Sequence, residues 1–554
     1  MTNKQIADKF EQLAKLMEIH GENPFKIKGY STAAFTIDRY PHPINLLPID
    51  ELAAIKGIGS SSAGKINELL QTGTLKALED LIAKTPAGVI EMLKIKGLGA
   101  KKISVIWREM KLETIGELLY ACEENHLSMY KGFGAKTQES IVQNIRFLQQ
   151  HAQMHLYASC EQLAESIHEE LQQLLPGKNS ILSGDFAMQR EVIKEILFIT
   201  DTNEEALRSF FQNKNEFTFE EKSETGLRWK HEAGLMVHFH LCKKEEVLTA
   251  HLQHSATPEV FALLQPLLPE VSSGTEAELF KQNGIPQIPA FARENAIVVK
   301  NILVKKEMPL VLKLQDIKGL IHCHSTWSDG LHSIEEMAHE CINAALEYMV
   351  ITDHSKSAFY ANGLNEGRIV QQHEEIQLLN KSFSGFRIFK GIESDILNDG
   401  SLDYSNDVLA TFDVVIASIH SNLKMDKDKA TQRLIKAIEN PYTTILGHPT
   451  GRLLLSRPGY EINYEKVIDA CVQNNVVIEL NANPKRLDMD WPHLFYAMDK
   501  GAMISVNPDA HKKETIMQIK YGVLSAQKAL VPKERNLSCF SALELCAFLQ
   551  KKAK

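Results

Sequence analysis

The sequence predicts a multidomain protein of the α plus α/β class, with a helical N-terminal region, a mixed middle region and a C-terminal (β/α) barrel. Its 554 residues are too many for one hydrophobic core, so three or four domains are expected. Up to about residue 150, short helical patterns are joined by glycine-containing turns. From residue 319 onward, seven β-like runs alternate with helical segments, and this alternation is typical of a (β/α) barrel.

The composition is that of an ordinary globular protein, with 44% hydrophobic and 24% charged residues. A formal net charge of −9 gives no general attraction for nucleic acid, so any such contact must be local. The N-terminus lacks the apolar core of a signal peptide, and no run approaches 18 apolar residues. The eight cysteines form no C-x-x-C pair, which suits reduced thiols. We therefore expect a cytoplasmic protein without membrane contacts, and we expect a monomer.

Residues 3–20 are predicted to form the first helix, with Gly21 as its stop signal. After it, three turns of one type occur at residues 55–59, 95–99 and 130–134, each reading h-K-G-h-G with h apolar or aromatic. Each turn follows one helical pattern and precedes another, and this arrangement resembles the helix-hairpin-helix motif. The candidate DNA-binding residues are Gly57, Gly59, Gly97, Gly99, Gly132 and Gly134, with Lys101, Lys102 and Lys136 adding charge.

Such a turn has a direct use in binding DNA. Two glycines let the backbone reverse tightly, and the helix that follows offers free N–H groups to a phosphate oxygen. These contacts detect the phosphate backbone and not the base sequence. A single copy would be read as a plain connector, whereas three copies favour DNA binding. Residues 1–150 hold 19 Lys and Arg against 17 Asp and Glu, so the affinity should be modest.

The C-terminal region places ligand-type residues at the ends of its β-like runs. It opens with I-H-C-H, where His322 and His324 lie two residues apart and therefore point the same way in a strand, while Cys323 points away and is expected to be a packed thiol. Active sites of (β/α) barrels lie at the C-terminal ends of the strands. The residues that follow the runs in this way are His322, His324, Asp329, Asp353, His354, Glu393, His420, His448, Asp509 and His511.

The order of these regions resembles that of the bacterial family X DNA polymerases that carry a C-terminal PHP domain. The resemblance implies four domains: a lyase-like helical domain at 1–85, a helix-hairpin-helix or fingers-like region at 86–150, a palm and thumb at 151–300, and a PHP phosphoesterase domain at 315–554. In relatives with lyase activity, a lysine at the position of Lys65 attacks the sugar aldehyde. Here a Lys65 that contacts phosphate, or is simply solvated, is the favoured interpretation.

The middle region departs from this family at its catalytic positions. Family X polymerases hold two Mg²⁺ ions with an Asp-x-Asp pair on one palm strand and a third Asp on a later strand. The corresponding residues here are Glu195, Leu197 and His238. One carboxylate beside a leucine cannot build a two-metal site, so we expect a degenerate nucleotidyltransferase-like palm that has kept its fold and lost its polymerase chemistry.

The C-terminal region, in contrast, matches the family at every ligand position, and the family surrounds three metal ions there. The resemblance assigns His322, His324, Glu393 and Asp509 to the first ion, Glu393, His420 and His448 to the second, and Asp329, His354 and His511 to the third. Imidazole with carboxylate suits Mn, Zn or Fe and does not choose among them. The resemblance also makes Glu393, His324, Asp329 and His420 the expected catalytic residues.

Two basic residues lie just past ligand positions. Lys356 follows His354 in D-H-S-K, and Arg452 follows His448 in H-P-T-G-R. Each is a candidate to hold the substrate phosphate, with simple ion pairing as an equal alternative. Glu479, at the end of the sixth run, is expected either to support a ligand or to be structural.

These expectations favour a metal-dependent phosphoesterase that acts on DNA, as a 3′–5′ exonuclease or a 3′-end processing enzyme in repair, with an inactive polymerase-like core. One alternative is a small-molecule phosphatase of the histidinol-phosphatase type, which would have no use for the three turns. A second is a DNA-binding scaffold with vestigial centres, and a third is a residual family X DNA polymerase, which Leu197 contradicts.

Overall fold

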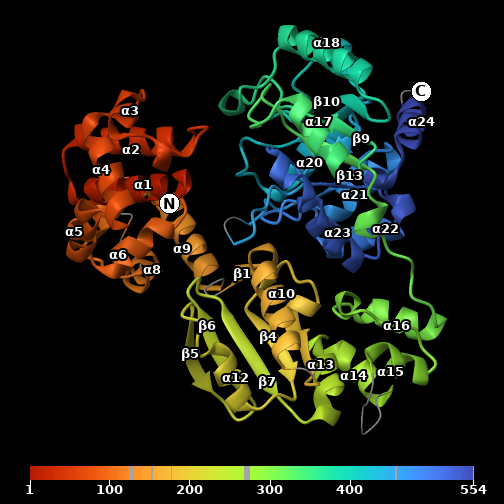
Figure 1. Cartoon of the computed structure of the whole chain (residues 1–554). Helices are drawn as coiled ribbons and strands as arrows, with labels where there is room; N and C mark the ends of the chain where they lie inside the picture. Colours follow the sequence, from red (N-terminus) through yellow and green to blue (C-terminus); the bar gives the residue numbers. More distant parts are fainter. Residues whose placement is uncertain are drawn as a thin grey trace. The chain divides into compact units, whose positions relative to one another are not determined.

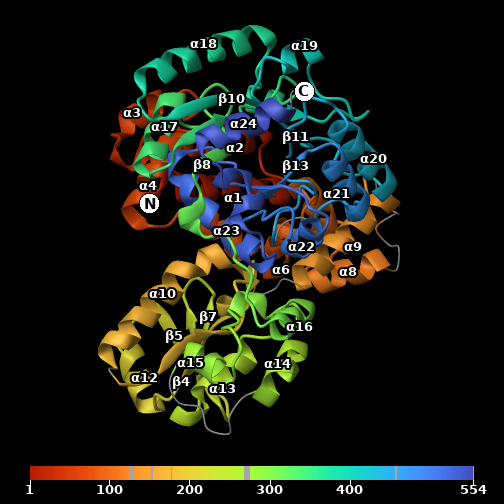
Figure 2. The same cartoon turned by 90° about the vertical axis from the view of Figure 1, so that its right-hand side faces the viewer.

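The structure is a computed structural model that describes residues 1–123, 127, 130, 132–150, 154–175, 177–267, 275–455 and 458–552. The chain divides into two units, Met1–Ala152 and Gln153–Lys554. Figures 1 and 2 show both, with labels on many of their helices and strands. The predicted fold class is confirmed: helices in the N-terminal part, a mixed sheet in the middle and a seven-stranded parallel sheet in the C-terminal part.

The N-terminal unit is built of helices around one apolar core. Its first helix begins at a capping box between Thr2 and Gln5, and it ends at Gly21, whose φ of 72° is the left-handed value that glycine tolerates, as predicted. Ile6, Phe10 and Leu13 lie on its buried face. The helices are α1 (Asn3–His20), α2 (Pro24–Asp38), α3 (Ile49–Ala54), α4 (Ser60–Thr72), α5 (Lys76–Lys84), α6 (Ala87–Glu91), α7 (Ala100–Arg108), α8 (Ile115–Glu123) and α9 (Ala135–Gln150).

The three predicted turns share one backbone conformation. The first glycine of each has a left-handed φ, at 101° for Gly57, 79° for Gly97 and 96° for Gly132. The next residue donates its N–H to the carbonyl three residues earlier over 2.9 to 3.1 Å. The second glycine directly precedes α4, α7 or α9. The three copies are therefore the same structural element, which requires glycine at its first position.

The middle region contains a five-stranded sheet in the order β2-β4-β7-β6-β5. One face packs against α10 and α12 through Phe198, Trp229 and Phe239, and the other packs against α13 through Leu197 and Ile199. The strands are β2 (Ser180–Ser183), β4 (Glu195–Thr200), β5 (Phe217–Lys222), β6 (Gly226–His231) and β7 (Met236–Leu241), and a short pair joins β1 (His155–Leu156) to β3 (Val192–Ile193). The helices are α10 (Tyr157–Leu174), α11 (Gly184–Ala187), α12 (Glu204–Phe211), α13 (Val247–His254), α14 (Pro258–Leu264), α15 (Glu276–Gln282) and α16 (Ala296–Lys305).

The C-terminal region is a parallel sheet in the order β14-β13-β12-β11-β10-β9-β8. All seven predicted runs are strands, and each is buried because helices cover the outside and side chains fill the inside. The strands are β8 (Gly319–Cys323), β9 (Tyr348–Ile351), β10 (Arg387–Asp395), β11 (Val414–Ser418), β12 (Ile445–Leu446), β13 (Val477–Asn481) and β14 (Ile504–Asn507). The helices are α17 (Ile334–Asn343), α18 (Glu366–Ser382), α19 (Asn406–Leu409), α20 (Lys427–Ile438), α21 (Tyr464–Gln473), α22 (Trp491–Asp499), α23 (Ile519–Lys528) and α24 (Ala542–Lys552).

The sheet closes at its C-terminal edge, where the two outer strands meet. Cys323 and Ala510 form a parallel bridge. His324 donates its N–H to the Ala510 carbonyl over 2.9 Å, and Ala510 donates to the His322 carbonyl over 3.3 Å. This closure brings the end of the first strand beside the end of the last one. Residues almost 190 positions apart can therefore share one site.

None of the described helices combines the length and the hydropathy needed to cross a bilayer.

Candidate metal centre

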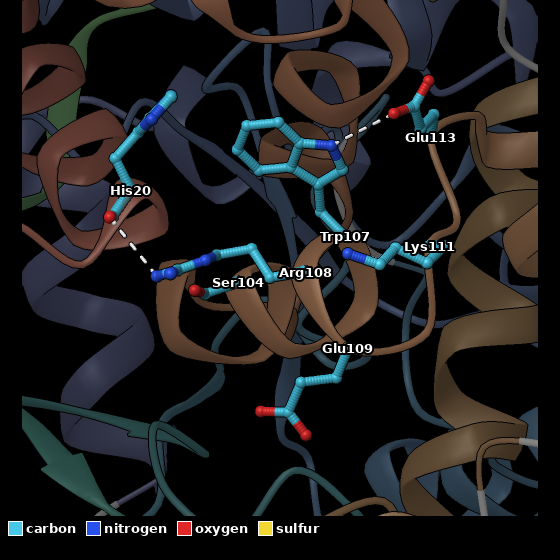
Figure 3. A pocket seen from close by; sticks show the side chains of 7 residues that line it. All are labelled: His20, Ser104, Trp107, Arg108, Glu109, Lys111 and Glu113. Carbon is cyan, nitrogen blue, oxygen red and sulfur yellow. Dashed lines mark hydrogen bonds between the residues drawn. The ribbon is translucent and has the colours of Figure 1, made fainter.

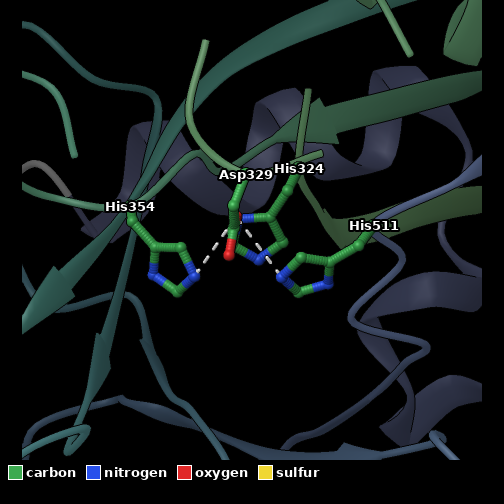
Figure 4. Close-up of side chains that lie close together, drawn as sticks. All are labelled: His324, Asp329, His354 and His511. Carbon is green, nitrogen blue, oxygen red and sulfur yellow. Dashed lines mark ion pairs between the residues drawn. The ribbon is translucent and has the colours of Figure 1, made fainter. Parts of the chain in front are cut away.

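All nine predicted metal ligands lie together at the C-terminal ends of the barrel strands. Their ligand atoms form four overlapping groups with metal-binding spacing, in which every atom lies within 4.8 Å of the others. Figure 4 shows one of these groups, with three imidazoles turned towards the Asp329 carboxylate. The groups are His324, Asp329, His354 and His511; His322, Glu393 and His448; His322, His324 and Asp509; and His354, Glu393 and His420.

Glu393, at the end of β10, is the common point of the cluster. Its Oε1 lies 3.2 Å from His322 Nε2, 3.1 Å from His420 Nε2 and 3.0 Å from His448 Nε2. Its Oε2 lies 3.0 Å from His354 Nδ1. The side chain is only 1% exposed, so this carboxylate is surrounded by imidazoles and not by water. A bridging role between ions is the chemistry that such a position allows.

Asp509 and Asp329 complete the cluster on the side of the first strand. Asp509 Oδ1 lies 3.1 Å from His324 Nε2 and 3.5 Å from His322 Nε2. Asp329 Oδ1 lies 3.6 Å from His354 Nε2 and 3.5 Å from His511 Nε2. Since the groups share His322, His324, His354 and Glu393, the exact division among three ions stays a prediction.

The I-H-C-H segment is not the regular strand that the alternation argument assumes. The register of β8 shifts between Ile321 and Cys323, and the strand ends at Cys323, so His324 lies beyond it. His322 has a φ of 65°, in the left-handed region that is rare for non-glycine residues. Both rings still reach Asp509, although their planes are inclined by 50°. Cys323 is a buried, packed thiol, as predicted.

Two more ligands have unusual backbone conformations. His448 has a φ of 22° and Asp509 a φ of 53°. Backbone strain of this kind costs about 1–3 kcal/mol per residue and is concentrated at functional sites. Three left-handed residues among the nine predicted ligands therefore indicate that the positions of these side chains matter more than local stability.

Carboxylates behind the imidazoles fix their orientation. Asp395 Oδ1 lies 2.7 Å from His420 Nδ1, and Glu479 Oε1 lies 2.5 Å from His322 Nδ1. Glu479 also accepts a 2.6 Å hydrogen bond from the backbone N–H of His448. The first two contacts each hold one ring nitrogen and direct the other into the cluster, as is usual for metal-binding histidines, whereas the third holds the backbone of His448. Glu479 thus contacts two of the predicted ligands, and whether it supports bound metal stays a prediction.

Asp395 is not among the predicted site residues, although G-I-E-S-D places it two residues after Glu393 on one strand. Asp353 is one of the ligand-type residues that follow a β-like run, but it has another role. Its carboxylate accepts hydrogen bonds from the Ser325 and Ser328 hydroxyls over 2.7 and 2.5 Å. Asp353 therefore holds the loop that follows β8 and lies outside the four ligand groups.

Charge and hydrogen bonding both fit bound cations. Burial raises the pKa of Glu393, but the surrounding histidines more than offset this and hold it well below the usual range. The buried His324 Nδ1 and Glu393 Oε2 make no hydrogen bond within the described part of the chain. Imidazole and carboxylate atoms arranged in this way are consistent with several divalent ions.

The pKa values of the histidines diverge within the cluster. Burial lowers the pKa of His420, but Glu393 and Asp395 outweigh it and raise the value to about 10. His511 behaves in the same way beside Asp329 and Asp509, with a pKa of about 9. Burial and the neighbouring His511 and His354 lower the pKa of His324 to about 3. Without metal, some imidazoles therefore carry a proton at neutral pH while others do not.

The two candidate phosphate-binding cations pair with carboxylates. Lys356 Nζ lies 2.7 Å from Glu366 Oε1. Arg452 donates over 2.8 Å to Glu191, which belongs to the middle region. Lys356 and Arg452 therefore both form the ion pairs that were the alternative to phosphate binding. A role of either residue in binding the substrate phosphate stays a prediction.

The second glycines of the three turns leave the next helices open to a ligand. Gly59 and Gly99 are N-caps without a side-chain cap, and a Cβ built on Gly59, Gly99 or Gly134 would meet nothing within 4 Å. Lys101 and Lys136 are exposed beside these helix starts. The turns therefore present open N–H groups and charge, as the motif requires.

The Lys65 side chain lies beside an aromatic ring of the N-terminal unit. Its Nζ is 6.0 Å from the centre of the Tyr30 ring.

The N-terminal unit also has a pocket between the ends of α1 and α7, shown in Figure 3, where Trp107 and Arg108 face His20. Its rim carries Arg108 and Lys111 against Glu109 and Glu113. With two charges of each sign, the pocket has no net attraction for phosphate.

The positions of the polymerase carboxylates come together in the sheet of the middle region. Leu197 on β4 is opposite His238 on β7, and Glu195 Oε1 lies 3.0 Å from His238 Nδ1. Arg228 on β6 bonds to Glu195 over 3.2 Å and also pairs with Glu221. None of the four metal-binding groups found in the described residues includes these side chains.

The barrel and its ligand cluster have the architecture of a metal-dependent phosphoesterase, and the matching family models agree with it. A PHP domain model matches residues 321–483. A helix-hairpin-helix domain model matches residues 1–75, and a SAM-like helix-hairpin-helix tandem model matches residues 89–146.

Similarity to known proteins extends over the whole chain. It is 33% identical to the DNA polymerase/3′-5′ exonuclease PolX of Bacillus subtilis, and the alignment covers 100% of both chains. The chain therefore belongs to the bacterial family X DNA polymerases with a C-terminal PHP domain. A probable phosphatase of Caldanaerobacter subterraneus is 27% identical over 42% of this chain and 91% of its own. One from Thermoanaerobacter pseudethanolicus is 30% identical over 34% of this chain and 77% of its own.

Metal uptake should release protons, because His420 and His511 have pKa values of about 10 and 9 and must bind metal as neutral imidazoles. The affinity for Mn²⁺ should therefore rise from pH 6.5 to 8.5, by about tenfold per pH unit for each proton released. Titration calorimetry in buffers of different ionisation enthalpy counts these protons. Asp395→Asn, which removes a carboxylate beside His420, should reduce the count, whereas an affinity independent of pH would contradict this account.

Proposed function

We propose that this protein is a metal-dependent hydrolase of DNA phosphodiesters that acts as a 3′–5′ exonuclease or 3′-end processing enzyme in repair. The observation that carries the proposal is the convergence of nine ligand side chains around the buried Glu393, in a chain that also has three helix-hairpin-helix turns. The B. subtilis relative is named as a DNA polymerase and a 3′-5′ exonuclease, which supports the second activity for this barrel.

The ligand set suits the chemistry of a phosphodiester, which is anionic and resists attack by hydroxide. Divalent ions such as Mn, Zn or Fe, three to a site, would supply the positive charge that the phosphate needs and would lower the pKa of a water molecule. Glu393, His324, Asp329 and His420 would hold the reacting groups in place. Asp395 and Glu479 keep two of the imidazoles in the orientation that this task requires.

The turns of the N-terminal unit would hold the DNA backbone while the barrel hydrolyses the ester. Their open helix starts at Gly59, Gly99 and Gly134 fit phosphate oxygens, with no dependence on base sequence. Lys101, Lys102 and Lys136 would add charge. Lys65 fits the same role better than that of a lyase nucleophile, since it lies among such turns.

We propose that the middle region no longer polymerises. Glu195, Leu197 and His238 stand where three carboxylates are needed, and a single carboxylate cannot hold two Mg²⁺ ions. The Glu195 carboxylate is already shared between His238 and Arg228. The Arg228 guanidinium therefore supplies the positive charge beside Glu195 that a metal ion supplies in an active polymerase palm.

A second candidate function is a phosphatase of small phosphomonoesters, because the relatives that match the barrel alone are named probable phosphatases. The three turns favour DNA as the substrate. Turnover of a labelled oligonucleotide compared with that of a free phosphomonoester under the same conditions separates the two functions.

His324→Ala should abolish hydrolysis of DNA, by at least about a thousandfold, because this imidazole belongs to two of the ligand groups. DNA binding should persist, since the turns are in the other unit. Release of labelled nucleotides and fluorescence anisotropy measure the two properties. His339→Ala on α17 is the matched control and should retain activity, and a fully active His324→Ala protein would exclude this site.

Lys101→Gln with Lys102→Gln should weaken DNA binding and reduce the slope of log affinity against log salt by about 1 for each lysine removed. Hydrolysis of a small phosphoester should not change. Lys4→Gln with Lys15→Gln is the matched control, because both are exposed lysines of α1 paired with Asp8 and Glu11. An equal loss in both double variants would show that the turns do not bind the DNA.

A further inference from the structure

One guanidinium lies at the edge of the metal centre with most of its donors unused. Arg486, in the loop between β13 and α22, places its Nε 3.8 Å from Asp509 Oδ2. Its side chain is 21% exposed, and its guanidinium makes no hydrogen bond to any residue that the structure describes. Lys356 and Arg452, in contrast, each pair closely with a carboxylate. Arg486 therefore has the free donors and the position that phosphate binding requires.

The chemistry of arginine suits this place. A guanidinium offers two parallel N–H donors to two oxygens of one phosphate, and it keeps its charge beside other cations because it does not deprotonate. One oxygen of the Asp509 carboxylate, Oδ2, forms an ion pair with Arg486, while the other, Oδ1, lies 3.1 Å from His324 Nε2. A phosphate bound at this cluster would therefore have two sources of positive charge: the metal ions that the cluster would hold, and the guanidinium of Arg486.

The loop that carries Arg486 is held by a second arginine. Arg452 donates from Nε to the Arg486 carbonyl over 2.8 Å and from its terminal nitrogen to the Leu487 carbonyl. The N–H of Leu454 donates to the Lys485 carbonyl over 2.7 Å. The segment that follows His448 thus runs along the Arg486 loop, and the Arg452 side chain contacts two carbonyls of that loop.

The middle region holds Arg452 in turn. Glu191, just before β3, accepts a 2.8 Å hydrogen bond from the Arg452 guanidinium, which is 17% exposed. Arg190 beside it pairs with Glu294 over 2.6 Å, and Glu294 pairs with the buried Lys528 of α23. A continuous set of contacts therefore connects the palm-like region to the edge of the metal centre.

We propose that Arg486 binds the non-bridging oxygens of the substrate phosphate and that the palm-like region positions it through Glu191 and Arg452. The inference rests on the proposed hydrolase function and adds a task for a region without polymerase chemistry: it holds the loop of the neighbouring active site. Arg486 contacts the substrate, whereas Glu191 and Arg452 are positioning residues.

The first experiment measures Arg486 directly in the full-length, Mn²⁺-loaded protein. Arg486→Gln should lower kcat/KM on DNA and the affinity for inorganic phosphate, each by about 10- to 100-fold, the loss expected for a charge-assisted hydrogen bond. Arg486→Lys should recover part of both, and the bound metal should stay unchanged. Phosphate affinity is measured without turnover, so it decides the inference even if the protein does not hydrolyse DNA. An unchanged phosphate affinity in Arg486→Gln overturns the proposal.

The second experiment tests the positioning by a double-mutant cycle. Glu191→Ala should lower phosphate affinity and kcat/KM by about tenfold, and adding it to Arg486→Gln should cause no further loss. Glu161→Ala is the matched control, because Glu161 joins the same two regions through Lys520 at 2.5 Å and Tyr521 at 2.9 Å without touching the Arg486 loop. Equal losses in Glu161→Ala and Glu191→Ala, or additive losses in the double variant, overturn the positioning role.

Discussion

The barrel depends on one physical constraint, which is that Glu393 is buried among imidazoles instead of water. Four histidine nitrogens lie within 3.2 Å of its two oxygens. Burying a carboxylate costs several kcal/mol unless charges around it compensate. The surrounding imidazoles more than offset this cost for Glu393 itself and hold its pKa well below the usual range. The buried His324 Nδ1 and Glu393 Oε2 still make no hydrogen bond within the described part of the chain, and bound divalent cations would satisfy such atoms.

In the middle region, the one carboxylate at the polymerase positions, Glu195, is paired with side chains of the protein instead. There Arg228 satisfies Glu195 and Glu221 directly, and Leu197 packs against α13. The protein itself thus supplies positive charge beside Glu195, which supports the proposal that this region keeps its fold without polymerase chemistry. In the barrel, by contrast, the arrangement of the imidazoles and carboxylates is consistent with bound cations. The contact between Glu191 and Arg452 offers a reason for retaining both.

The sequence was enough to predict the strands and the side chains that gather at their ends, because both depend on local patterns. Each barrel strand is an apolar run, and each ligand follows such a run, as Glu393 follows F-K-G-I. The left-handed conformation of His322 was not predictable, because it coincides with a register shift within β8 that no local pattern signals. The partners of Arg452 and Arg486 were hidden for another reason: Glu191 lies 261 positions from Arg452, and only the packing of two regions brings them together.

The most direct test of this account is an assay of the protein on a labelled primer–template with Mn²⁺, with and without dNTPs. The account predicts that the primer shortens from its 3′ end and is not extended in either condition, because the barrel hydrolyses and the palm-like region lacks its carboxylates. His324→Ala should abolish the shortening without revealing any extension. Template-dependent extension that survives stringent purification would contradict the account, since it would require a functional metal site around Glu195.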